Sequence, residues 1–252
     1  CTPGIVMSLH ALWSVRPDPT RPEIEAALQG NLCRCTGYAP IVRAAQSVSG
    51  YGKAADDVLH AGRAAMGDKL DALRDGRRVV VETDAGQAIV PVDVDDLAAV
   101  LDEHPEATLV AGATDVGLWV TKFMRDIAPV VSIGHLMDEI VVEDGRIVFG
   151  AGVSYARAFA VLKQRVPQMA DLIDRIGGAQ VRAMGTIGGN IANGSPIGDT
   201  PPPLIALGAE ITLRKGARRR TVRLEDFFID YGRQDREKGE FVDSISVPLP
   251  GD

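Results

Sequence analysis

The chain has 252 residues, of which 46% are hydrophobic, enough for one or two domains with a substantial core. Its net charge of −7 argues against a nucleic-acid partner, and no run of residues approaches the ~20 apolar positions of a membrane helix, so we expect no membrane partner either. Three cysteines without obvious mates favour a reducing, cytoplasmic compartment over a secreted disulfide scaffold.

Residues 1–52 are expected to form a small all-helical module. Apolar side chains recur with the helical period from Ile5 to Trp13, and Thr20-Arg-Pro-Glu23 is a capping-box pattern that predicts the start of a second helix. Pro40 is typical of a third helix start, which Gly50 would end. Because the sequence begins with a cysteine rather than Met, we expect this module to be incomplete at its N-terminus.

Residues 53–83, rich in Ala, Gly, Asp and Arg, are interpreted as a linker with one polar helix over 57–73. From residue 84 to 252, strand and helix patterns alternate, which indicates an α+β fold, or an α/β fold with an antiparallel portion. The expected helices cover 93–103 and 115–123 and lie within 155–166 and 169–181, and the expected strands cover 108–111, 129–133, 139–142, 146–149, 210–214, 220–224 and 241–247.

Cys1, Cys33 and Cys35 are candidate metal ligands. A disulfide, a zinc site, an iron–sulfur cluster and three inert thiols are the alternatives. Two cysteines at i and i+2 are poorly placed to bridge each other and well placed to hold one metal centre. Pro3 and Pro40 each predict a helix start nearby, and the exposed N–H groups of two such starts would stabilise anionic thiolates.

The stretch LVAGATDVGLWVTKF, residues 109–123, predicts a strand, a tight turn and a helix. This geometry aims backbone N–H groups at a ligand above the helix start, often a phosphate. Thr114 would add a hydroxyl group, and Asp115 is expected to cap the helix. An ordinary capped strand–helix unit is the alternative.

A second glycine-rich stretch has five glycines within the fourteen residues from Gly185 to Gly198. This density is too high for a helix or a central strand, so we expect a loop that lets a bound cofactor approach the backbone closely. A set of tight turns between strands is the alternative. Candidate hydrogen-bonding side chains in this loop are Thr186, Asn190, Asn193, Ser195 and Asp199.

The segments CTPGIVMSLHALW and GNLCRCTGYAPIV resemble the second 2Fe–2S domain of the xanthine dehydrogenase and aldehyde oxidase family of molybdenum hydroxylases, a domain of the four-helix-bundle type. Four cysteines bind the cluster in that family. The resemblance implies that Cys1, Cys33 and Cys35 are the second, third and fourth ligands, and that the first precedes residue 1. Zinc remains the alternative metal.

Residues 84–252 resemble the FAD-binding domain of the same family, most closely in TIGGNIANGSPIGD. The resemblance implies that the first glycine stretch binds the FAD pyrophosphate through backbone amides and that the second lies along the diphosphate, ribityl and flavin. It also implies that Ile176 and Val242 lie near the flavin and Tyr231 near the nicotinamide side. The implied FAD residues are Leu109, Val110, Ala111, Gly112, Ala113, Thr114, Asp115, Ile176, Thr186, Gly188, Gly189, Asn190, Asn193, Asp199 and Val242. The C-terminal subdomain, which supplies a basic residue to FAD in relatives, is expected to be missing.

The family resemblance implies an oxidoreductase function in electron transfer. A molybdenum cofactor on a partner chain or domain would oxidise a purine, and electrons would pass through 2Fe–2S clusters to FAD and then to NAD⁺ or O₂. The implied partner is a molybdenum-binding large subunit, in a heterotetramer of two small and two large chains. No residue is expected to act as a catalytic acid or base. The alternatives are a carbon monoxide, aldehyde or nicotinate-type hydroxylase, and a cofactor-free scaffold fragment.

Overall fold

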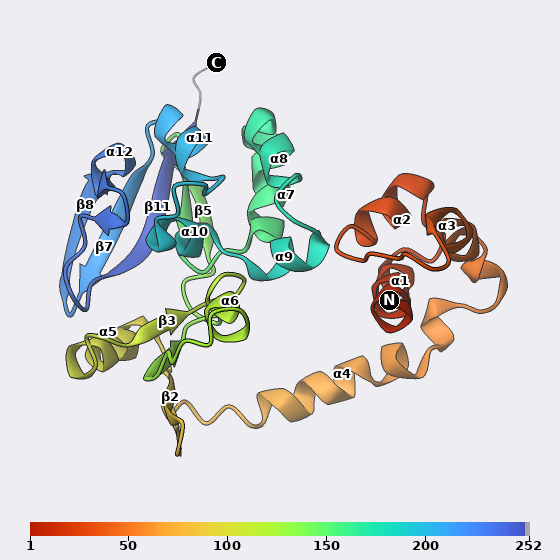
Figure 1. The fold of residues 1–252 in the computed structure, drawn as a ribbon, viewed down its shortest axis with the longest axis horizontal. Coiled ribbons are helices and arrows are strands. Elements are labelled where there is room, and N and C mark those ends of the chain that lie inside the picture. The colour runs from red at the N-terminus through yellow and green to blue at the C-terminus, as the bar shows by residue number, and fades with distance from the viewer. Residues whose placement is uncertain (250–252) are drawn as a thin grey trace. The chain divides into compact units, whose positions relative to one another are not determined.

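The computed structural model of the chain describes residues 1–249. These residues form two compact units (Figure 1). Unit 1 consists of Cys1–Asp75 together with the short segment Gly177–Gln180, and unit 2 consists of Gly76–Ile176 and the residues from Val181 onward. None of the helices within the described range is long and apolar enough to cross a membrane.

Unit 1 is entirely helical, as the sequence predicts. Glu23 accepts a hydrogen bond from the backbone N–H of Thr20 at 2.8 Å, which completes the expected capping box. Its small core contains Ile5, Ile24, Leu28, Cys33, Val42 and Ala45. Its elements are α1 (Thr2–Val15), α2 (Arg21–Ala27), α3 (Tyr38–Gln46), η1 (Val48–Gly50), η2 (Ala54–Asp56) and α4 (Val58–Asp71). Helix α4 buries no residue, in agreement with its polar sequence.

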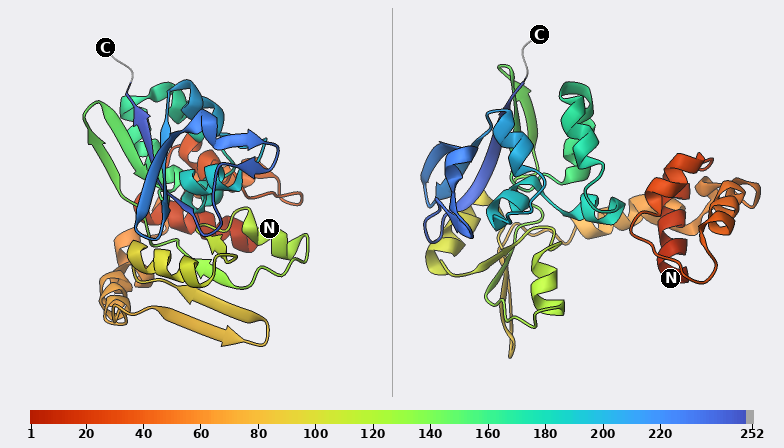
Figure 2. Two further views of the ribbon diagram at one scale, coloured as in Figure 1. Left: turned by 90° about the vertical axis from the view of Figure 1, so that its left-hand side faces the viewer. Right: turned by 45° about the horizontal axis from the view of Figure 1, so that its top comes forward.

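The first part of unit 2 is a four-stranded sheet in the order β1-β2-β4-β3. Strands β2, β4 and β3 are parallel, and β1 pairs antiparallel with β2 in a hairpin, seen at one edge of the unit in Figure 2. The elements are β1 (Val79–Thr83), β2 (Gly86–Val90), α5 (Val94–Glu103), β3 (Thr108–Val110), α6 (Val116–Thr121) and β4 (Val130–Ser132). Leu97, Val100 and Leu101 of α5 pack against Ile89 and Val131 of the sheet.

The second part of unit 2 is a five-stranded antiparallel sheet in the order β5-β6-β11-β7-β8. Its strands are β5 (Ile140–Glu143), β6 (Arg146–Gly150), β7 (Glu210–Lys215), β8 (Arg218–Arg223) and β11 (Phe241–Pro248), and β9 (Phe228–Asp230) pairs separately with β10 (Arg233–Gln234). The helices are α7 (Tyr155–Arg165), α8 (Pro167–Ile173), α9 (Ala179–Met184), α10 (Ile187–Asn193), α11 (Pro201–Ala206) and α12 (Leu224–Phe227). Buried residues of β6, α7, α8, β7 and β11 form one core, so the fold class is α+β as expected.

The structure contains β2, β9, β10, α11 and α12, which were not expected from the sequence, and it differs from the expectations at three further elements. Strand β1 falls within the expected linker, and all five of its residues are exposed, so no alternation of apolar and polar residues revealed it. The single helix expected within 169–181 is divided into α8, which ends at Ile173, and α9, and Gly177 between them has a φ of 54°, which a right-handed helix does not contain. Within the glycine-rich stretch, Ile187–Asn193 forms helix α10 rather than a loop.

Candidate functional site

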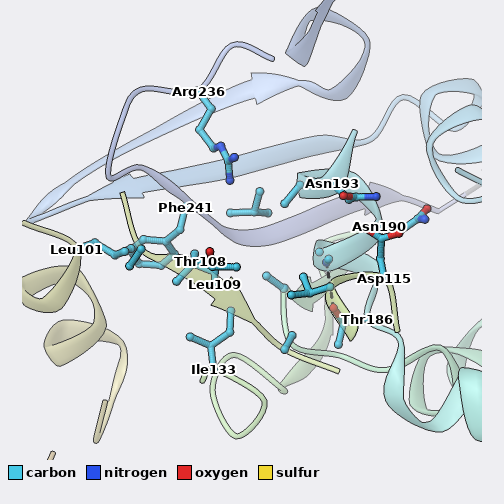
Figure 3. Close-up of a pocket in the computed structure, with 18 of the residues that line it drawn as sticks. Leu101, Thr108, Leu109, Asp115, Ile133, Thr186, Asn190, Asn193, Arg236 and Phe241 are labelled. Carbon is cyan, nitrogen blue, oxygen red and sulfur yellow. Dashed lines mark hydrogen bonds between the residues drawn. The ribbon is translucent and has the colours of Figure 1, made fainter. Parts of the chain in front are cut away.

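Unit 2 contains a cavity of about 810 Å³. Three segments supply most of its lining: the chain from Leu101 through β3 to α6, helix α10 with the residue before it, and residues 236–242. Figure 3 shows an apolar end, where Leu101, Leu109 and Phe241 lie, and a polar end with Thr186, Asn190 and Asn193. The cavity therefore has room for an elongated ligand with one apolar and one polar portion.

The turn between β3 and α6 presents unused backbone donors to this cavity. Within residues 1–249, no backbone hydrogen bond is donated by Gly112, Ala113, Thr114 or Asp115. Ala113 has a φ of 57°, a left-handed conformation that turns neighbouring N–H groups toward a common point and is uncommon outside glycine. Neighbouring N–H groups of this kind bind anions, phosphates above all.

Close packing explains why position 112 carries glycine. A Cβ atom built on Gly112 would overlap the main-chain carbonyl of Met184, so any side chain there would displace the turn from the segment behind it. The side chain of Asp115 occupies the N-cap position of α6 but makes no capping hydrogen bond. The expectation that Asp115 caps the helix is therefore wrong, because the carboxylate does not accept from the first turn.

Helix α10 forms despite its glycines because tertiary contacts outweigh their low helix propensity. Thr186 caps it by accepting a hydrogen bond from the N–H of Gly189 at 3.0 Å. The Cβ of any larger residue at Gly188 would lie 2.5 Å from Ala151, whose carbonyl accepts from the Gly188 N–H at 3.1 Å. The glycine thus allows the helix backbone to lie directly against the chain that follows β6.

Most of the predicted FAD residues line this one cavity. They are Leu109, Ala111, Gly112, Ala113, Thr114, Asp115, Thr186, Gly188, Gly189, Asn190, Asn193 and Val242. Val110, Ile176 and Asp199 are not among the lining residues, and Ile176 is instead buried in the main core. Tyr231 is 85% exposed and lies outside the lining as well. The role of each residue in binding FAD stays a prediction.

Asp199 nevertheless acts on a residue that faces the cavity. Burial raises the pKa of Tyr155, and the negative charge of Asp199 raises it further, so the phenol stays protonated and can donate a hydrogen bond. Tyr155 was missed as a lining residue because it begins α7, where its apolar ring reads as an ordinary core position. Trp119, Phe241 and Arg236 also line the cavity and were not predicted. No motif in the sequence marks any of them.

The thiols of unit 1 are only partly assembled. Cys1 and Cys33 lie 3.6 Å apart, sulfur to sulfur, and all three cysteines are free thiols. Hydrogen bonds from the backbone N–H groups of Thr36 and Gly37 lower the pKa of Cys33, against the opposing effect of burial. Cys35 is exposed, and among residues 1–249 no group of three potential ligands is close enough to hold a metal ion.

The local environment of Cys33 matches one part of the sequence-based expectation. Cys1 is the N-cap residue of α1 and Gly37 that of α3, so the starts of these two helices do flank the pair of close thiols. N–H donors directed at sulfur favour the thiolate, which is the form that binds metals. The structure therefore brings together Cys1 and Cys33 of the predicted ligand set and leaves Cys35 apart from them.

Comparison with known families gives two matches. Residues 84–250 match the family described as FAD binding domain in molybdopterin dehydrogenase, and residues 1–46 match a 2Fe-2S binding domain. The chain is 29% identical to the xanthine dehydrogenase/oxidase of Rattus norvegicus over 297 aligned residues, which cover 98% of this chain and 22% of the relative. It is 30% identical to the xanthine dehydrogenase of Drosophila pseudoobscura pseudoobscura, with 96% and 22% covered.

Among solved structures, a carbon monoxide dehydrogenase from Hydrogenophaga pseudoflava has a TM-score of 0.61 and 28% identity, covering 64% of this chain and 58% of that one. The chain spans about a fifth of the length of the curated relatives that it matches. The FAD-domain match alone extends over more than half of its residues. The chain therefore belongs to the molybdenum hydroxylase family, of which it carries the 2Fe–2S and FAD-binding domains.

Proposed function

We propose that this chain is the electron-transfer part of a xanthine dehydrogenase-like molybdenum hydroxylase, with FAD held in the cavity of unit 2 and an iron–sulfur centre in unit 1. The observation that carries the proposal is the cavity itself. It brings two glycine-dependent segments, far apart in the sequence, side by side in one lining within the family's FAD domain, with Gly112 packed against the main chain of Met184.

The residues present suit FAD. The unused N–H groups from Gly112 to Asp115 match the charge of a diphosphate, and the backbone of Gly188 and Gly189 lines the same cavity. Asn190 and Asn193 offer amide groups to polar ring edges or ribityl hydroxyls. When bound, FAD supplies the capacity to take up and release one or two electrons.

In this proposal the chain's own residues position the cofactor and perform no proton chemistry. Leu101, Leu109 and Phe241 exclude water at the apolar end of the cavity, where an adenine ring would lie. The protonated phenol of Tyr155 is held as a donor by its buried position. Cys1 and Cys33, with Cys35 as the further family ligand, would hold the iron–sulfur centre through thiolates.

The substrate and the partners belong to the proposal as well. Because the chain spans about a fifth of its relatives, we assign the molybdenum centre to another chain or domain, a large subunit in a heterotetramer of two small and two large chains. A purine is the proposed substrate and NAD⁺ the proposed acceptor, with O₂ as the alternative. The structural likeness to a carbon monoxide dehydrogenase favours a second candidate, the medium subunit of a hydroxylase of that type.

An absorption spectrum of the purified protein tests the proposal. The expected result is a pair of flavin bands with broad iron–sulfur absorbance, one FAD released per chain on acid treatment, and a cytoplasmic location in cell fractionation. A folded, colourless protein that takes up neither FAD nor iron would support the cofactor-free scaffold and contradict the proposal. Turnover of the complete assembly with xanthine, compared with carbon monoxide, would separate the two enzyme candidates.

A further inference from the structure

Arg236 brings an unbalanced positive charge to the cavity. It lies on the connection between β10 and β11, and Figure 3 shows its side chain pointing into the cavity from the side opposite Ile133. Arg236 is an exposed residue, because it borders the open cavity. Burial nevertheless lowers the pKa of its guanidinium, although the charge of Glu240 opposes this change. Arginine remains protonated in spite of such a shift.

No residue of the described chain neutralises this cation. Arg236 takes part in no hydrogen bond or ion pair with any residue from 1 to 249. The carboxylate that acts on it at a distance, Glu240, is already engaged with the guanidinium of Arg220 through contacts of 2.7 and 2.8 Å. The five N–H groups of Arg236 are therefore free to donate to a ligand in the cavity.

The connection that carries Arg236 is fixed at both ends by one side chain. Arg220 on β8 donates to the Asp235 carboxylate at 2.7 Å, to the Asp235 carbonyl at 2.7 Å and to both oxygens of Glu240. The Glu240 side chain is only 1% exposed, and it also accepts from the N–H of Glu237 at 3.0 Å. The backbone on either side of Arg236 is thus held by a charge network whose buried member is Glu240, so its direction toward the cavity is built into the fold.

The same cavity holds the second set of unused donors, the N–H groups from Gly112 to Asp115. Two donor sets on one cavity, both without acceptors in the chain, call for a ligand with several anionic oxygens. We propose that Arg236 binds the diphosphate of the dinucleotide in this cavity and is a cofactor-positioning residue for FAD, on the side away from the Gly112–Asp115 turn. This inference rests on the proposed function, because it takes the occupant to be FAD.

The experiment measures binding of FAD to the deflavinated full-length protein, by quenching of flavin fluorescence, for the wild type, Arg236→Ala and Arg236→Lys. Arg233→Ala is the matched control, since it removes the same charge from an exposed position on β10, three residues earlier and outside the cavity lining. We expect the FAD dissociation constant to rise about tenfold to a hundredfold in Arg236→Ala, less in Arg236→Lys, and not at all in the control.

Two probes locate the contact. Arg236→Ala should weaken competition by ADP, which carries the diphosphate, and leave the weak competition by adenosine unchanged. Equal weakening of both probes would show that Arg236 supports the base or the shape of the cavity, and would overturn the inference. Unchanged FAD affinity would overturn it too, and normal FAD affinity with a raised KM for NADH would assign the cation to the other dinucleotide instead.

The outcomes separate this inference from the proposed function. A wild-type protein that binds no FAD contradicts the proposed function itself. A wild-type protein that binds FAD, with an Arg236→Ala variant that binds it equally well, contradicts only the role of Arg236. Far-ultraviolet circular dichroism and the thermal midpoint of each variant check the fold, and Arg236→Lys, which keeps the charge and most of the volume, gives a graded answer if the alanine variant is unstable.

Discussion

The thiol site of unit 1 and the cavity of unit 2 are constructed in different ways. In unit 1 the chemistry belongs to side chains: two sulfur atoms lie 3.6 Å apart, with backbone N–H groups directed at Cys33. In unit 2 it belongs largely to the backbone: unused N–H groups at the β3–α6 turn and glycines that allow segments to pack closely. A side-chain site can lose its function while the fold survives, whereas a backbone site fails together with its packing.

Replacement of a thiol tests the first half of this comparison and has the largest expected effect on a cofactor. Cys33→Ser should abolish the electron paramagnetic resonance signal of the centre in unit 1, because an alcohol is a poor ligand for iron. The FAD content should not change, since the cavity lies within unit 2. Retention of the signal would remove Cys33 from the ligand set.

Cys35→Ser provides the paired measurement. The family motif predicts the same loss of signal, whereas the structure leaves Cys35 exposed and apart from the other two thiols. A normal signal in this variant would show that the closely spaced pair of Cys1 and Cys33 defines the protein's contribution to the centre, and that the motif overstates it.

A methyl group at position 112 tests the second half. Gly112→Ala should lower the free energy of unfolding of unit 2 by about 3 kcal/mol or more, because its Cβ would overlap main-chain atoms that cannot rotate away. FAD content should fall in parallel. Gly117→Ala is the control: its Cβ meets nothing within 4 Å, and it lies within helix α6, so it should stabilise slightly. Equal urea midpoints for the two variants would contradict this account.

Disruption of the charge network formed by Arg220, Asp235 and Glu240 has an intermediate expected effect on stability. Glu240→Gln should destabilise the protein by roughly 2 kcal/mol at pH 7, because it leaves Arg220 without a full counter-charge. Burial, the largest single effect, raises the pKa of Glu240, but hydrogen bonds from Arg220 and from the N–H of Glu237, together with the charge of Arg220, outweigh it and lower the pKa of this carboxyl. The stabilisation that ionised Glu240 contributes is therefore complete above its unfolded-state pKa of 4.5. It is lost as the pH falls through the lower folded-state pKa.

Denaturant titrations between pH 7 and pH 3 measure this effect. The wild type should lose stability more steeply than Glu240→Gln in the acid range. Glu225→Gln, which removes a 50% exposed partner of Arg223, should change little at any pH. Parallel pH curves for the wild type and Glu240→Gln would show that the network does not depend on the charge of Glu240.

The smallest expected effect is the loss of one helix cap. Thr186→Ala removes the hydroxyl that accepts from the Gly189 N–H and should cost about 1 kcal/mol of unfolding free energy, whereas Thr186→Ser should restore most of it. Because the cap fixes a helix that lines the cavity, a modest fall in FAD content should follow. A Thr186→Ala variant as stable as Thr186→Ser would show that packing against Ala151 suffices to hold α10.

The sequence predicted most of the fold because the periodic helices and the hairpins of the larger sheet carry strong local signals. Helix α5 lies within the expected range 93–103, and β7 and β8 form the expected strands of the larger sheet. The prediction from sequence was wrong at α10. The local glycine content predicts a loop there, whereas contact with Ala151 and the Thr186 cap favour a helix. The prediction failed at β1 because an edge strand exposed along its whole length shows no alternation.

The site was predicted to the extent that it depends on motifs. The glycine stretches marked two of the three segments that line the cavity, and the cysteines marked the thiol pair. Arg236 escaped notice because it lies in a charged connection that resembles an ordinary solvated turn. Its role depends on the tertiary structure, in which Arg220, on a different hairpin, binds Glu240, the carboxylate whose charge acts on Arg236. No local pattern encodes such competition between two arginines.

Strand β11 occupies the middle of the larger sheet, bonded to β6 on one side and β7 on the other, and its first two residues, Phe241 and Val242, form part of the cavity wall. Phe241 and Val242 pair with Arg214 and Leu213 of β7, and the ladder to β6 begins at Ser244, so the wall is tied to β7 directly and to β6 through the rest of the strand. A ligand that binds there meets a preformed surface. Little conformational entropy of the protein is therefore lost on binding. A preformed site of this kind suits a ligand that stays bound better than one that is exchanged in every catalytic cycle.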